Sequence, residues 1–131
     1  MASIRREMRL ARDADSVWRA FADLGAVHTR LAPGFVTDCR LEDGARQVTF
    51  ANGVCVRELI VDVDPDRRRL AYAVVNGSAS HHHATFEVVP DGGGCLVIWT
   101  ADVLPAEVAP VFAAMMTQGA EVMGRALAAG A

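Results

Sequence analysis

The sequence predicts an α+β fold in which a curved, seven-stranded antiparallel sheet wraps around a long C-terminal helix, with two short helices after the first strand. Two observations carry this prediction. From residue 35 to residue 103, short β-type segments follow one another between turn signals such as Asp43-Gly44 and Asn52-Gly53. After Leu104-Pro105 the apolar residues recur at helical spacing to about Ala129. The 131 residues fit a single domain, residues 1–131, because 52% hydrophobic residues can form a real core.

The first elements are predicted by alternation and by capping residues. Ser3 to Leu10 alternates apolar and polar residues, as a half-buried strand does. Asp13 stands where a helix cap is needed and predicts a first helix from about Ala14 to Leu24. A second short helix, Ala26 to Leu31, should end there because Pro33-Gly34 cannot continue it.

The turns set the registers of the following strands, because the length of a hairpin loop fixes which residues lie opposite each other. The predicted pairs are Leu41–Arg46, Cys39–Val48, Thr37–Phe50, Val48–Val56, Arg46–Glu58, Ile60–Tyr72, Glu58–Val74, Val88–Val97 and Phe86–Trp99. The third turn is read as Pro65-Asp66-Arg67 and the last as the loop from Asp91 to Gly94. These registers place one mainly apolar set of side chains on one face of the sheet and a polar set on the other.

Composition excludes several functions. The formal charge of −3 lacks the basic excess that nucleic acids or anionic lipids attract, so we expect no nucleic acid partner. All 13 basic residues are Arg, so a lysine Schiff base with a carbonyl substrate or pyridoxal phosphate is excluded, and no cofactor is expected. The arginine bias is typical of a GC-rich bacterium.

Three cysteines without a CxxC pair indicate reduced thiols in a cytoplasmic protein. Met1 to Arg12 has no continuous apolar run, so neither a signal peptide nor membrane insertion is predicted.

Beyond this layout, the order of several short motifs resembles a known family. The motifs are Val17-Trp18, Asp23, Pro33-Gly34, Gly44-Ala45-Arg46, Asn52-Gly53, Arg57-Glu58, Tyr72, Pro90-Asp91-Gly92, Trp99 and Asp102. From Asp13 to Arg125 the chain resembles the polyketide cyclase/dehydrase branch of the SRPBCC (START-like) superfamily. The resemblance implies the helix-grip fold and an internal ligand cavity, but no particular reaction. Leu31 departs from the pattern, which has an aromatic residue before Pro-Gly, and this departure could open the cavity mouth.

The predicted inner face carries the candidate site residues. Arg46 and Glu58 are cross-strand neighbours, so Arg46 could bind a ligand carboxylate, ketone or phenol while Glu58 holds it, or Glu58 could act as a base. A purely structural ion pair is the alternative. Tyr72, His82 and Trp99 could add a hydroxyl donor, an imidazole acid or base and an aromatic wall, although Tyr and Trp are also common core residues and a purely structural role is the alternative for them. The expected ligand contacts are Arg46, Val48, Val56, Ile60, Phe86, Trp99, Phe112, Met115, Gly119 and Met123.

Gly119 and Gly124 remove side-chain volume from the last helix, and we expect a void there that Gly119→Leu would fill without unfolding the protein. The triplet His81-His82-His83 is predicted to bind no metal. Ring directions alternate along a strand, so only His81 and His83 share a side, with Thr100 or Asp102 opposite His83.

Three functions remain open. The leading prediction is a binder of a small hydrophobic molecule, such as a polyketide, lipid or aromatic metabolite, in a monomer or homodimer. The alternative is an enzyme, a polyketide cyclase, aromatase or dehydratase, with Glu58, Tyr72 and His82 as catalytic residues. A third is an assembly protein that uses an outer apolar patch around Leu96 and Ile98.

Overall fold

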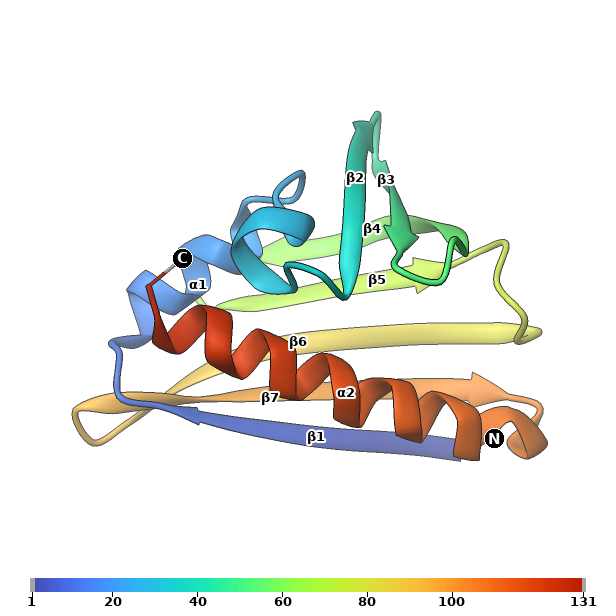
Figure 1. Ribbon diagram of the computed structural model, residues 1–131. Helices are drawn as coiled ribbons and strands as arrows, with labels where there is room; N and C mark the ends of the chain where they lie inside the picture. Colours follow the sequence, from blue (N-terminus) through green and yellow to red (C-terminus); the bar gives the residue numbers. More distant parts are fainter. Residues whose placement is uncertain (1, 131) are drawn as a thin grey trace.

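A computed structural model describes residues 2–130 of the chain. The order of elements confirms the predicted fold: one strand, two short helices, six further strands and a long helix (Figure 1). Their bounds are β1 Ala2–Leu10, α1 Ala14–Ala22, η1 Val27–Leu31, β2 Val36–Glu42, β3 Ala45–Phe50, β4 Cys55–Asp64, β5 Arg69–Val74, β6 His81–Asp91, β7 Gly94–Leu104, η2 Ala106–Val108 and α2 Ala109–Ala128.

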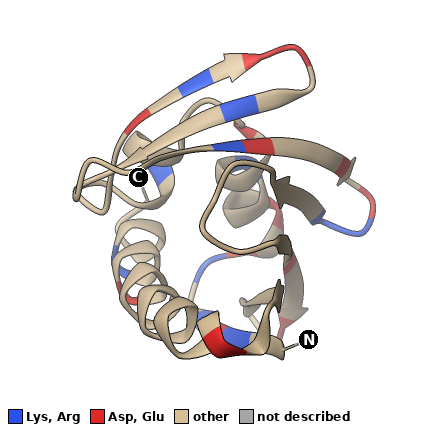
Figure 2. Cartoon of the chain, turned by 90° about the vertical axis from the view of Figure 1, so that its right-hand side faces the viewer, with Lys and Arg blue, Asp and Glu red and all other residues tan. Residues whose placement is uncertain are grey.

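The strands form one antiparallel sheet in the order β1-β7-β6-β5-β4-β3-β2. The sheet curls strongly, so that β2 and β3 stand almost upright in Figure 1, while β1, β6 and β7 run almost horizontally and α2 crosses β6 and β7. Seen from the right-hand end of that view, the strands and α2 encircle the middle of the molecule (Figure 2). This arrangement is the helix-grip fold.

The turn-based registers are correct except near two bulges. In β2, a bulge at Thr37 places Val36 rather than Thr37 opposite Phe50. In β4, a bulge at Val61 coincides with a turn one residue longer than predicted, in which Arg68 adopts a positive φ of 51°. The extra turn residue and the bulge compensate, so Ile60 still lies opposite Tyr72. All other predicted strand pairs are observed.

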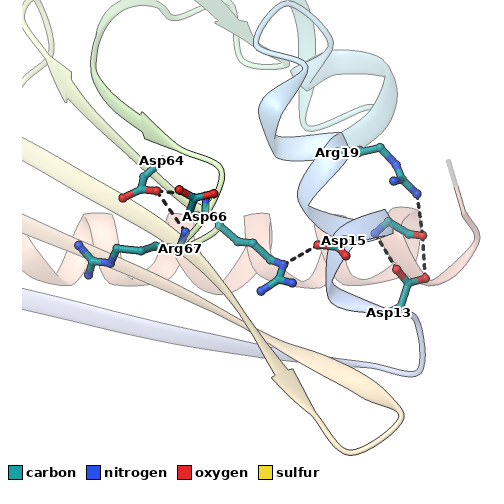
Figure 3. A network of polar contacts seen from close by, with 8 residues as sticks. Asp13, Asp15, Arg19, Asp64, Asp66 and Arg67 are labelled. Atoms are coloured by element: carbon teal, nitrogen blue, oxygen red, sulfur yellow. Dashed lines mark hydrogen bonds and ion pairs between the residues drawn. The ribbon is translucent and has the colours of Figure 1, made fainter.

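The helix α1 closes one end of the sheet and is fixed there by polar contacts (Figure 3). Asp13 caps the helix by accepting hydrogen bonds from the backbone N–H and the hydroxyl of Ser16, at 2.9 and 2.7 Å. Asp15 forms an ion pair at 2.8 Å with Arg68 of the turn between β4 and β5. Since Arg68 and Asp15 come from distant parts of the sequence, this contact holds α1 against the neighbouring turn.

The core is densely packed at the α1 end. Phe21 of α1 packs on Phe86 of β6 with ring centroids 4.7 Å apart, and Met123 and Leu127 of α2 are buried in the same cluster. The first helix ends at Ala22 instead of Leu24, and the second is a single π-helical turn, η1. Leu31 is buried in this core. At the opposite end of the sheet, near Trp99 and His82, the side chains leave a cavity.

Candidate functional site

A cavity of about 280 Å³ lies between the sheet and the first half of α2. Its wall is mainly apolar and aromatic and comes from strands β3 to β7, from the η1–β2, β3–β4 and β5–β6 connections and from α2. The lining residues are Phe35, Phe50, Asn52, Val54, Val56, Glu58, Tyr72, Val74, Asn76, Gly77, Ser78, His82, Trp99, Phe112, Met115 and Met116. A largely apolar concave site with a few polar groups is typical of small-molecule binding.

The loop residues among them mark the mouth of the cavity. Asn52 and Val54 belong to the β3–β4 loop, and Asn76 to Ser78 belong to the β5–β6 loop. All of them are exposed, whereas Phe112 and Met116 of α2 are buried. A ligand would therefore enter between these two loops, at the end of the molecule that faces the viewer in Figure 2.

The Arg46–Glu58 pair is at the deep side of the cavity. The two residues lie directly opposite each other on β3 and β4, and Arg46 Nε donates to Glu58 Oε1 at 2.9 Å. Arg46 is 2% exposed and Glu58 7%. A second guanidinium nitrogen of Arg46 donates to the carbonyl of Leu24 at 3.2 Å, so Arg46 reaches the α1 side rather than α2. The predicted pairing and hydrogen-bond contact are therefore correct, but Arg46 turns toward Leu24 and not toward the long helix, as both side chains had been expected to do.

Only the acid of this pair belongs to the cavity wall. Glu58 lines the cavity, whereas Arg46 does not. The guanidinium of Arg46 lies 5.7 Å from the centre of the Tyr72 ring, a cation–π distance, and is thus covered by Tyr72 and Glu58. The predicted role of Arg46 as a direct ligand anchor does not fit this placement.

Tyr72 presents its hydroxyl to the same part of the cavity. The indole N–H of Trp99 donates to the Tyr72 hydroxyl at 3.1 Å, which fixes both side chains. Burial is the main reason why the pKa of Tyr72 is raised well above its ordinary value, and the nearby charge of Glu58 raises it further. Tyr72 therefore stays protonated, and its hydroxyl can donate a hydrogen bond but is a poor base.

His82 lies on the wall near α2, with its ring edge-to-face on Phe112 and a centroid distance of 4.9 Å. Burial lowers the pKa of His82 below its ordinary 6.5, and His81 and His83 lower it slightly more. The imidazole is therefore mainly neutral near pH 7, a state in which one ring nitrogen donates a hydrogen bond and the other can accept one or act as a base.

Seven of the predicted site residues are brought together on the cavity wall: Val56, Glu58, Tyr72, His82, Trp99, Phe112 and Met115. Val48, Ile60, Phe86, Gly119 and Met123 lie outside the wall, as Arg46 does. Phe86 stacks behind Trp99 at a centroid distance of 5.0 Å and supports the wall without forming it. Val48 and Met123 are buried in the packed core.

The prediction that Gly119 leaves an empty space beside α2 is wrong. A Cβ atom at Gly119 would lie 3.3 Å from ring atoms of both Phe35 and Trp99, so the two rings occupy the space that the glycine leaves. A Cβ atom at Gly124 would meet nothing within 4 Å, so Gly124 faces open space. Gly119 therefore allows a close approach of Phe35 and Trp99 to the helix, and these rings in turn form cavity wall.

Sequence reasoning missed nine lining residues: Phe35, Phe50, Asn52, Val54, Val74, Asn76, Gly77, Ser78 and Met116. The predicted registers place Val74 opposite Glu58 on the inner face, so Val74 could have been predicted as a lining residue. The loop residues carried no such signal, because side-chain direction follows a period of two only within a strand.

The histidine triplet has the predicted alternation. His82 points inward, whereas His83 lies opposite Asp102 and His81 opposite Leu104 on the outer face. Among residues 2–130, no group of three or more His, Cys, Asp or Glu side chains is arranged to hold a metal ion. Within the same residues, no helix is long and apolar enough to cross a membrane.

Comparison with known proteins gives both a family and a set of folds. The sequence profile of the family described as "Polyketide cyclase / dehydrase and lipid transport" matches residues 1–131. No curated protein matches the chain in sequence. A protein of Thermobifida fusca, solved by NMR, shares 31% identity at a TM-score of 0.77, over 98% of this chain and 91% of that one.

Two further solved structures share the fold at lower identity. A START superfamily protein from Mycobacterium smegmatis has a TM-score of 0.74 and 15% identity, over 97% of this chain and 94% of that one. Truncated norcoclaurine synthase from Thalictrum flavum also has a TM-score of 0.74, with 23% identity over 97% of this chain and 91% of that one. At such identities the likeness concerns the fold alone.

Proposed function

Because the chain belongs to the polyketide cyclase / dehydrase and lipid transport family, we propose that it binds a small hydrophobic molecule in the cavity between its sheet and α2. The observation that carries this proposal is the cavity itself. Its aromatic and aliphatic wall is interrupted by only a few polar groups, and a mouth opens between the β3–β4 and β5–β6 loops. The volume of about 280 Å³ is near the lower end of ligand sites, which suits a molecule of one to three rings or a short chain.

Two methionines make the wall adaptable. Met115 and Met116 both line the cavity from α2, and the unbranched, polarizable methionine side chain can adjust to ligands of different shape. A binder of this kind needs no catalytic group. The Glu58–Arg46 pair would then serve to fix the register of β3 and β4 and to define the polar end of the cavity.

Adjacent residues at the end of β5 offer a matched test. Val74 lines the cavity, whereas Val75 is 52% exposed. An apolar fluorescent dye should bind the wild-type protein with a saturable signal, and bound ligand should raise the melting temperature by mass action. Val74→Trp should fill the cavity and remove saturable binding, whereas Val75→Trp should leave it unchanged. Equal binding by both variants would show that the dye binds elsewhere and would contradict the proposal.

A second candidate function, catalysis of a cyclisation or dehydration, is favoured by one specific observation. Glu58, Tyr72 and His82 line the same cavity and offer a carboxylate, a protonated hydroxyl and a neutral imidazole. In such a reaction Tyr72 would donate a hydrogen bond to a carbonyl oxygen while Glu58 or His82 removed a proton. Glu58→Gln and His82→Gln should then lose turnover of a poly-β-ketone substrate but retain its binding, whereas a pure binder shows no turnover in the wild type.

A further inference from the structure

The two members of the buried ion pair differ in their access to the cavity, and this difference constrains which ligands can bind. Glu58 belongs to the wall and Arg46 does not. We propose that the cavity selects a flat aromatic molecule that carries a hydroxyl group and rejects molecules that carry a carboxylate. This inference rests on the proposed binding function and names the chemical class of its ligand.

The rejection of carboxylates follows from which charge faces the ligand. The Arg46 guanidinium is engaged by Glu58 Oε1 at 2.9 Å and by the Leu24 carbonyl at 3.2 Å, and it is covered by the Tyr72 ring. A ligand carboxylate in the cavity would therefore meet the negative charge of Glu58 without reaching Arg46. Like charges repel strongly beside a carboxylate that is only 7% exposed, so a fatty acid or aromatic acid loses affinity there.

The preference for a hydroxyl follows from two unused hydrogen-bonding positions. Among residues 2–130, Glu58 Oε2 accepts no hydrogen bond, although Oε1 is bound by Arg46. The Tyr72 hydroxyl accepts from Trp99, and its own hydrogen has no acceptor within the same residues. A ligand hydroxyl both donates and accepts, so one such group can satisfy Glu58 and Tyr72 together. A ketone can use only Tyr72, and a carboxylate can use only Tyr72 against the repulsion of Glu58.

The aromatic preference follows from the rings on the wall. Phe35, Phe50, Tyr72, Trp99 and Phe112 contribute rings to the cavity, and Phe35 meets Phe50 edge-to-face with centroids 5.6 Å apart. Rings held in fixed mutual contact present flat faces and edges, which pack well against another flat ring.

A series of naphthalene derivatives tests the selection with one constant ring system. Binding of naphthalene, 2-naphthol and 2-naphthoate to the full wild-type chain is measured by calorimetry at neutral pH, where the naphthol is uncharged and the naphthoate is ionised. The hydroxyl should tighten binding about ten-fold relative to naphthalene, the gain expected from a hydrogen bond to a charged group. The carboxylate should weaken binding at least about ten-fold relative to naphthalene.

Two variants assign the effect to Glu58. In Glu58→Gln, the penalty on naphthoate should largely disappear, while the surface substitution Glu87→Gln on the outer face should leave the whole series unchanged. Since Glu58→Gln leaves the buried Arg46 charge unpaired, the double variant Arg46→Met/Glu58→Gln serves as a second test that buries no lone charge. It should also lose the discrimination between naphthoate and naphthalene.

The outcomes separate this inference from the proposed function. If naphthoate binds as tightly as 2-naphthol or more tightly, the selection is overturned while binding in the cavity stands. Unchanged discrimination in both Glu58 variants would overturn the role of Glu58. If none of the three compounds binds, naphthalene included, the proposed binding function fails, and the ligand class fails with it.

Discussion

Replacing Arg46 by methionine removes the cation of the buried pair and keeps a side chain of similar length. The variant loses the 2.9 Å bond to Glu58 and the 3.2 Å bond to the Leu24 carbonyl, and it leaves a carboxylate that is only 7% exposed without its partner. Removing one member of a buried ion pair costs about 3–5 kcal/mol of unfolding free energy. We expect a loss near the lower end, because the cavity gives water access to Glu58 Oε2.

The expected change in melting temperature follows from the length of the chain. For 131 residues the unfolding entropy is about 0.28 kcal/mol/K, so a loss of about 3–5 kcal/mol corresponds to a fall of roughly 11–18 °C, and we expect a fall of about 11 °C. Circular dichroism during heating measures it. The double variant Arg46→Met/Glu58→Gln should recover most of the loss, because no uncompensated charge stays buried. A fall of less than about 4 °C in Arg46→Met, or a double variant less stable than Arg46→Met, would refute this account of the pair.

Two further predictions concern α2 and β6. Gly119→Leu should lower the melting temperature by roughly 4–11 °C, since its side chain would overlap Phe35 and Trp99 at a cost of about 1–3 kcal/mol, whereas Gly124→Leu has free space and should keep or slightly raise it. Equal melting temperatures for the two variants would contradict the close packing at Gly119. Because burial lowers the pKa of His82 below 6.5, the unfolded chain binds this proton first as the pH falls. The unfolding free energy should therefore decrease below about pH 6.5 until the folded pKa is reached, and a denaturant titration of His82→Gln should show a flatter dependence in that range.

The registers could be predicted from the sequence because hairpin loops fix them locally. Asp43-Gly44 and Asn52-Gly53 have positive φ at their glycines, and the pairs on either side of these turns are observed. The bulges at Thr37 and Val61 carry no glycine or proline to mark them, so they could not be predicted. The bulge at Val61 did not change the predicted pairing of Ile60 with Tyr72, because the turn at Arg68 is also one residue longer than predicted.

The site could be predicted only in part, because a register gives the face of a residue but not its depth. Arg46 and Glu58 share a face, and the prediction made Arg46 the ligand anchor. In the structure the longer side chain passes behind the wall to Leu24, which leaves the acid to face the ligand. Leu41 lies opposite Arg46 and yet is 59% exposed, whereas Arg46 is 2% exposed. Depth depends on how the sheet curls around α2, which no local pattern encodes.

The proposed function requires that the space between the sheet and α2 binds a ligand. Its most direct test is an NMR titration of the wild-type chain with naphthalene, following methyl and aromatic resonances. Our expectation is saturable shifts at cavity residues such as Val56, Val74, Met115 and Met116, with no shifts at Leu96 and Ile98 on the outer face. Saturable shifts confined to the outer face, or no saturable shifts at all, would contradict it.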